Sequence, residues 1–92
     1  MEISQTDGNE NGKFYIEMEG EAMAEMTYTW RGADRIIINH TLVDERLKGK
    51  GAGKQMVVAA VEFARSKGIS IIPQCQFAKS VFDKVGELRD VL

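Results

Sequence analysis

Val43-Asp44-Glu45-Arg46-Leu47-Lys48-Gly49-Lys50-Gly51-Ala52-Gly53-Lys54 is the stretch that decides the fold of this 92-residue chain. An apolar strand predicted over residues 35–43 runs into it, and an apolar helix predicted from about residue 53 to residue 67 follows it. The first N–H groups of a helix are free and its dipole favours negative charge, while glycines let a ligand approach the backbone closely. The stretch therefore predicts an anion site, and we expect it to hold a phosphate-bearing cofactor.

Length and charge limit what the rest of the chain can do. Ninety-two residues make one domain, and its 43% apolar and 28% charged residues are ordinary for a folded chain. The net charge of −2 gives no reason to propose a nucleic acid as partner. No apolar run is long enough for a transmembrane helix and the first residues do not resemble a signal peptide, so we expect no membrane association.

The chain contains one cysteine and one histidine, and both facts restrict its chemistry. Because Cys75 is alone, an internal disulfide is excluded and a reducing, cytoplasmic setting is the simplest expectation. Zinc sites need clusters of cysteine and histidine, and His40 is far from Cys75 in the sequence. We therefore expect no metal site.

Three strands precede the glycine turn. Residues 1–12 are polar and predict a frayed start that ends in a turn. Strands follow over residues 13–18, 22–30 and 35–43, joined by short turns, and the second of them alternates apolar and polar side chains. The sequence predicts that these three strands form an antiparallel meander.

A helix, a strand and a second helix follow the glycine turn. The first helix is predicted over residues 54–67, with Gly68 ending it. The near-continuous apolar strand at residues 69–73 should pair parallel to the strand before the turn, through a right-handed crossover. A shorter helix is predicted over residues 77–85, and residues 87–92 should be a tail. The predicted fold class is α/β (α+β), with a single domain over residues 13–92.

The glycine turn does not match two common phosphate-binding motifs. A P-loop needs a glycine where Lys48 stands and a hydroxyl where Gln55 stands. A dinucleotide-binding fingerprint needs G-x-G-x-x-G after a parallel strand, and this chain has G-x-G-x-G after an antiparallel meander. The remaining pattern, R-x-x-G-x-G from Arg46 to Gly51, resembles the [QR]-x-x-G-x-[GA] signature of the GCN5-related N-acetyltransferases.

The resemblance extends over residues 13–86 and is greatest to a small, minimal branch of that superfamily. His40-Thr41-Leu42-Val43 resembles the H-T-x-V segment of this branch, and Cys75-Gln76-Phe77 resembles its C-x-F segment. The order of strands and helices is also that of the family core, a minimal acyl-CoA N-acyltransferase fold. The resemblance implies an acetyltransferase that uses acetyl-CoA as cofactor.

The resemblance also implies where coenzyme A would bind. Pantetheine would pair with backbone groups of the strand that enters the turn, and the pyrophosphate would take backbone N–H groups of the turn. Arg46 would brace the turn, and the lysines would supply counter-charge. The candidate cofactor-binding residues are Thr41, Leu42, Val43, Arg46, Leu47, Lys48, Gly49, Lys50, Gly51, Ala52, Gly53, Lys54 and Phe77.

Cys75 and His40 are the candidate catalytic residues. The resemblance places Cys75 near the thioester, where it would either accept the acetyl group or line the pocket, and the helix start beside it would lower its pKa. His40 would either act as general base or be a structural residue. Since neighbouring strand residues face opposite ways, His40 and Thr41 cannot both face one pocket.

Two departures from larger family members leave the function open. Phe82 stands where those members commonly have a tyrosine that protonates the leaving thiolate, and nothing selects Ser80 as a substitute. The elements that shape the acceptor site are absent, namely the first strand, the paired helices and the last two strands. An open site suits a protein lysine, an N-terminus or a polyamine, or completion by a second subunit. The alternatives are a non-catalytic acyl-CoA-binding or sensing module, and an interaction domain whose turn binds nothing.

Overall fold

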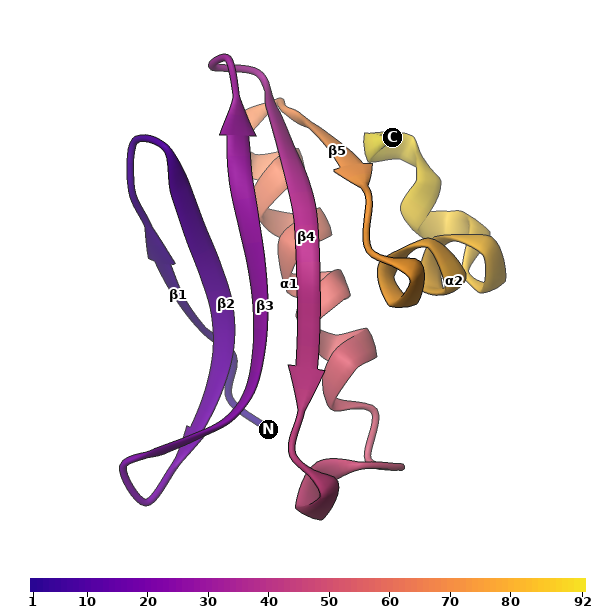
Figure 1. The fold of residues 1–92 in the computed structure, drawn as a ribbon. Coiled ribbons are helices and arrows are strands. Elements are labelled where there is room, and N and C mark those ends of the chain that lie inside the picture. The colour runs from indigo at the N-terminus through magenta and orange to yellow at the C-terminus, as the bar shows by residue number, and fades with distance from the viewer.

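The computed structural model describes residues 1–92 as one five-stranded sheet with helices on one side (Figure 1). The strand order follows the chain, and the first four strands are antiparallel while the last pairs parallel with its neighbour. The predicted meander, crossover and parallel strand are confirmed. The strands are β1 (Ser4–Asp7), β2 (Asn11–Met18), β3 (Glu21–Arg31), β4 (Arg35–Val43) and β5 (Ser70–Pro73).

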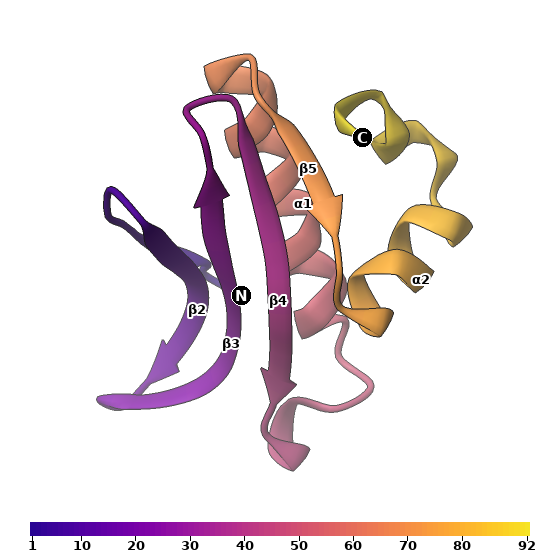
Figure 2. The same ribbon diagram turned by 45° about the horizontal axis from the view of Figure 1, so that its top comes forward.

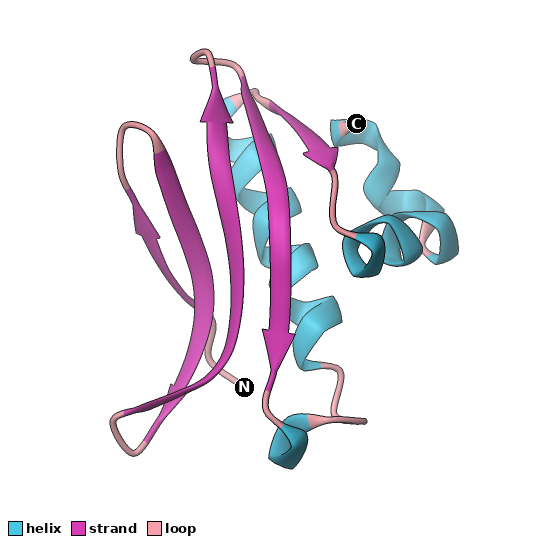
Figure 3. Ribbon diagram, viewed as in Figure 1, coloured by secondary structure: helices cyan, strands magenta, loops and turns pink.

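Two α-helices and two short 3₁₀ helices complete the fold (Figure 3). Gly68 ends the first α-helix in a left-handed conformation at φ 67°, as predicted, and its N–H donates to carbonyls of the last turn. None of the helices is both long and apolar enough to cross a membrane. The helices are η1 (Glu45–Leu47), α1 (Ala52–Lys67), α2 (Gln76–Lys84) and η2 (Gly86–Val91).

The frayed start predicted for residues 1–12 is wrong, because β1 pairs with β2 in register. Polar contacts rather than apolar burial hold this strand. Asp7 Oδ1 accepts hydrogen bonds from the Tyr28 hydroxyl at 2.6 Å and from Trp30 Nε1 at 2.9 Å. Because an apolar pattern does not record such contacts, the expectation that no strand precedes residue 13 is also wrong.

The tail predicted for residues 87–92 is wrong for most of its length, because η2 spans Gly86–Val91. Leu88 and Val91 are buried against the core, so this segment contributes to packing. Arg65 of α1 also holds the segment, donating to Asp90 Oδ1 at 2.6 Å.

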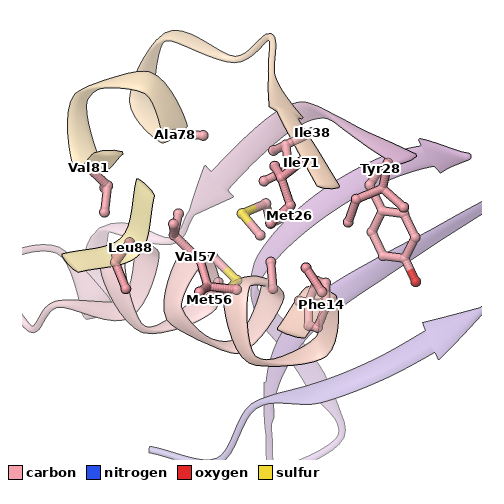
Figure 4. Packing of buried hydrophobic residues seen from close by; sticks show 14 of the residues in the cluster. Phe14, Met26, Tyr28, Ile38, Met56, Val57, Ile71, Ala78, Val81 and Leu88 are labelled. Carbon is pink, nitrogen blue, oxygen red and sulfur yellow. The ribbon is translucent and has the colours of Figure 1, made fainter. Parts of the chain in front are cut away.

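The core lies between α1 and one face of the sheet (Figure 4). Sheet residues such as Phe14, Met26 and Ile38 meet Met56 and Val57 of α1, and no polar side chain is buried. No helix covers the opposite face of the sheet (Figures 1 and 2). We call this opposite side the uncovered face.

A β-bulge in the middle of β4 changes which side chains face α1. Thr27 pairs with His40 whereas Tyr28 pairs with Ile38, so Asn39 is an extra residue. Before the bulge Ile38 is buried in the core, and after it the alternation is displaced by one position. Thr41 consequently lies on the α1 side of the sheet, and His40 points to the uncovered face.

Candidate functional site

A cavity of about 520 Å³ lies between the end of β4, the glycine turn, the start of α1 and α2. We call it the turn cavity. It brings together most of the residues that the sequence selected around the turn. Its lining residues are Thr41, Val43, Leu47, Lys48, Gly49, Gly51, Ala52, Gly53, Lys54, Phe77, Ser80, Val81 and Lys84.

The glycine turn takes a backbone conformation that its glycines permit. Gly49 and Gly51 have φ values of 78° and 77°, in the left-handed region that other residues rarely adopt. Asp44 caps η1 just before the turn by accepting a hydrogen bond from the Arg46 N–H at 2.9 Å. The turn therefore has a defined shape that its own sequence specifies.

Arg46 braces the turn, as the sequence predicted, and its side chain does not line the cavity. Its guanidinium donates to Asp44 Oδ1 at 2.9 Å and to Glu21 Oε1 at 3.1 Å, which ties the turn to the β2–β3 hairpin. Hydrogen bonds from Arg46 lower the pKa of the Asp44 carboxyl from 3.8 to about 2. The Arg46 side chain is thus held at the surface by carboxylates of the protein itself.

The start of α1 presents free N–H groups to the cavity. Gly51 caps the helix without a side-chain hydrogen bond, and no acidic residue lies in the first turn. The N–H groups of Ala52, Gly53 and Lys54 have no backbone acceptor, since the first such bond is from Gln55 to the Gly51 carbonyl at 2.9 Å. This end of the helix is therefore available to an anion.

The charges around the cavity have one sign. Lys48, Lys54 and Lys84 line it from the turn, α1 and α2, and no carboxylate does. A hollow of about 600 Å³ on the uncovered face differs, because Lys13 is its only cation and lies 3.8 Å from Glu25. In a chain of net charge −2, three lysines without a carboxylate make the turn cavity the better anion site.

Phe77 closes the cavity against the start of α1. A Cβ atom added to Gly53 would lie 2.4 Å from Cζ of the Phe77 ring, so the ring would have to move to admit any side chain there. Gly53 thus allows the close approach of α2 to α1.

Strands β4 and β5 separate beside the cavity. Their pairing ends at Ile38 and Pro73, as predicted, where the Gln74 and Cys75 N–H groups both donate to the Ile38 carbonyl at 3.1 Å. Past this point β4 has no partner on the β5 side. The Asp44 N–H donates to the Met23 carbonyl of β3. Because the backbone groups of successive strand residues point alternately to the two sides, those of Thr41 and Val43 point away from β3 and into this gap.

Cys75 lies at the inner end of this gap, as the residue that caps α2. Its Sγ atom is 3.4 Å from the Thr41 hydroxyl. Burial works against ionisation, but hydrogen bonds from the Thr41 hydroxyl and from the N–H groups of Ala78, Phe77 and Thr41 hold the pKa of Cys75 below its ordinary value. The thiol is therefore disposed to form a thiolate.

Several predicted site residues do not reach the cavity. His40 lies on the uncovered face, opposite Thr27 of β3, and does not line the cavity. The side chain of Leu42 is 70% exposed and Lys50 is also exposed, and neither lines the cavity. Phe82, which the sequence resemblance aligned with the family tyrosine, is buried in the core and is 2% exposed.

The sequence reasoning missed Val81 and Lys84 of the α2 wall, and it considered Ser80 without selecting it. With Phe77 they occupy positions i, i+3, i+4 and i+7, which form one face of a helix. That spacing was visible in the sequence. What the sequence did not show is that this face of α2 lies toward the glycine turn.

Comparisons with known proteins agree with this fold. The model of a family described as GCN5-related N-acetyl-transferase matches residues 13–91. A GCN5-like protein from Staphylococcus aureus, with a structure determined by NMR, is 40% identical and has a TM-score of 0.74. The match covers 98% of this chain and 85% of that one.

More distant structures share the fold alone. A ribosomal-protein-alanine N-acetyltransferase from Brucella melitensis is 11% identical, with a TM-score of 0.70 over 85% of this chain and 62% of that one. Aminoglycoside N-acetyltransferase AAC(6')-Iy, solved in complex with CoA, is 14% identical, with a TM-score of 0.66 over 90% of this chain and 88% of that one.

Proposed function

Because this chain belongs to the GCN5-related N-acetyltransferase family, we propose that it transfers an acetyl group from acetyl-CoA to an amine. One observation carries the proposal. Free N–H groups at the start of α1 and three lysines meet in the turn cavity, which no carboxylate lines. This combination matches the charge of a diphosphate ligand.

The residues present fit coenzyme A. The N–H groups of Ala52, Gly53 and Lys54 would hold the pyrophosphate, with Lys48 and Lys54 as counter-charges. The backbone groups of Thr41 and Val43 that point into the gap between β4 and β5 would pair with the pantetheine amides. Bound acetyl-CoA would supply an acetyl group activated as a thioester.

Cys75 offers a covalent route for the transfer. Its thiolate would attack the thioester carbonyl, forming an acetyl-cysteine as the bond to the coenzyme sulfur breaks. The acceptor amine would then attack this acetyl group, restoring the thiolate and losing a proton. The contacts with Thr41 and the start of α2 that lower the pKa of Cys75 support this route. Direct attack by the amine, with Cys75 present at the inner end of the gap but not acetylated, is the other route.

His40 would act as the base for the acceptor amine. The bulge at Asn39 places His40 on the uncovered face and Thr41 in the gap, one residue apart along β4. An amine that reaches the gap from the uncovered face would pass His40, and an imidazole is the side chain that most often serves as a general base. A face without helices suits a protruding amine, such as a protein lysine, an N-terminus or a polyamine.

A second candidate function is a non-catalytic acyl-CoA-binding or sensing module. The burial of Phe82 favours it, because no side chain from that position reaches the cavity to protonate a leaving thiolate. The uncovered face favours it too, since no helix there shapes an acceptor site.

Three measurements test the proposal. In NMR spectra, acetyl-CoA should shift the backbone amides of residues 41–43 and 47–54. Unmoved amides at millimolar ligand would exclude both the transferase and the sensor. Release of free thiol from acetyl-CoA with a panel of amines then separates the two, because a sensor binds the ligand and releases none. Mass spectrometry after incubation with acetyl-CoA tests the covalent route, in which the added acetyl group should disappear in Cys75→Ser.

A further inference from the structure

Lys84 is the only charged residue that α2 contributes to the turn cavity. It shares one helix face with Phe77, Ser80 and Val81, and this face forms the wall opposite the glycine turn. Lys79, on the same helix, is exposed and does not line the cavity. Of these two lysines of α2, only Lys84 therefore lies at the cavity.

The three lysines of the cavity are not equivalent. Lys48 lies 4.0 Å from Glu45, so part of its charge is balanced within the turn. Lys54 lies in the first turn of α1, beside the free N–H groups. Lys84 makes no ion pair within the chain and projects from the opposite wall.

Lys84 is also far from the position of acyl chemistry. Cys75 caps the start of α2, and Lys84 lies nine positions later in the last residue of the helix. At 1.5 Å per residue this separation is about 13 Å along the helix axis. Lys84 therefore belongs to the outer, phosphate-binding part of the cavity.

Coenzyme A carries two separate anionic groups, a pyrophosphate and a 3′-phosphate on the ribose. The turn and the start of α1 already offer the pyrophosphate free N–H groups and two lysines. Lys84, on the opposite wall, is then left without an anionic group to bind. We propose that Lys84 binds the 3′-phosphate and makes the cavity select CoA over 3′-dephospho-CoA. The inference rests on the proposed function. A lysine ammonium suits this role, because it is a compact charge with rotatable donors on a long stem.

Calorimetric titration of the whole protein with CoA and with 3′-dephospho-CoA tests the inference. The wild-type chain should bind CoA about tenfold more tightly, as expected for one hydrogen-bonded charge pair. Lys84→Ala should lower CoA affinity by about the same factor and leave 3′-dephospho-CoA binding unchanged. Lys84→Arg should keep the preference for CoA. Lys79→Ala, the matched control on the same helix, should change neither affinity.

The possible outcomes separate this inference from the proposed function. An equal loss of affinity for both ligands in Lys84→Ala would overturn the inference, because Lys84 would then contact a group that the two ligands share. Equal binding of both ligands by the wild-type chain would overturn the selectivity and leave the proposed function intact. Binding of neither ligand by the wild-type chain would overturn both.

Discussion

The two walls of the turn cavity are built on different principles. The wall made by the glycine turn and α1 presents backbone N–H groups, and left-handed glycines and the Asp44 cap set its shape. The α2 wall presents side chains, and its position depends on contacts with distant elements such as Gly53 and Thr41. The local sequence therefore specifies the wall made by the glycine turn and α1, whereas tertiary packing specifies the α2 wall.

Gly53→Ala changes the point where the two walls meet and should have the largest effect on CoA binding. The new Cβ would lie 2.4 Å from the end of the Phe77 ring, which is 40% exposed and can swing away. We expect a loss of about 1 kcal/mol in unfolding free energy, from overpacking. We also expect roughly tenfold weaker CoA binding as the ring moves. Urea unfolding and calorimetry measure the two effects.

A double variant shows whether the contact itself is responsible. In a Phe77→Ala background, Gly53→Ala should cost little further stability, because the two residues are in contact and their effects should not add. Additive losses of stability would contradict the close contact between the walls.

Gly51→Ala tests the turn wall without touching the α2 wall. Gly51 has φ 77°, and a Cβ added there would meet no atom closer than Gln55 Nε2 at 4.0 Å. The substitution therefore introduces backbone strain and no steric clash. We expect a loss of about 1–2 kcal/mol in unfolding free energy. Gly86→Ala is the control, because Gly86 has no neighbour within 4 Å and no positive φ, and it should be nearly neutral. If the two substitutions lower the free energy of unfolding in urea equally, the positive φ of Gly51 is not the cause of the loss.

Thr41→Val tests the α2 wall at its other end. Loss of the Thr41 hydroxyl should raise the pKa of Cys75 toward its ordinary value, since that hydroxyl is one of the groups that lower it. The rate of iodoacetamide alkylation should therefore rise with pH at a higher midpoint than in the wild-type chain. Thr41→Ser keeps the hydroxyl and is the control. An unchanged midpoint in Thr41→Val would show that the N–H groups at the start of α2 suffice.

The same contrast explains what could be predicted from the sequence. The turn and α1 are specified by short stretches of sequence. The end of α1 at Gly68 and the parallel strand after α1 were therefore predicted correctly. The bulge at Asn39 has no such signal, because it is defined by pairing with β3, and it decides that Thr41 rather than His40 faces the cavity. Lys84 was missed for a related reason. Its helix face was readable, but the direction of that face depends on how α2 packs.

Arg46 gives the smallest expected effect, because its ion pairs with Asp44 and Glu21 are exposed and solvent weakens such pairs. We expect Arg46→Ala to weaken CoA binding by no more than about threefold. Glu21→Gln, which removes one of its two partners, should have a smaller effect still. A loss as large as that in Gly53→Ala would mean that Arg46 contacts the ligand, and the turn wall would then rely on side chains as well.

The pH dependence of Asp44 gives a more direct measure of the same brace. Hydrogen bonds from Arg46 lower the pKa of Asp44 from 3.8 to about 2 in the folded protein. A lowered carboxyl pKa means that the stabilising contact is fully present above pH 3.8 and is lost as the pH falls toward 2. A carbon-detected NMR titration of the Asp44 carboxyl should therefore show a midpoint near 2, and Arg46→Ala should move it toward 3.8. An unmoved midpoint would assign the shaping of the turn to its glycines alone.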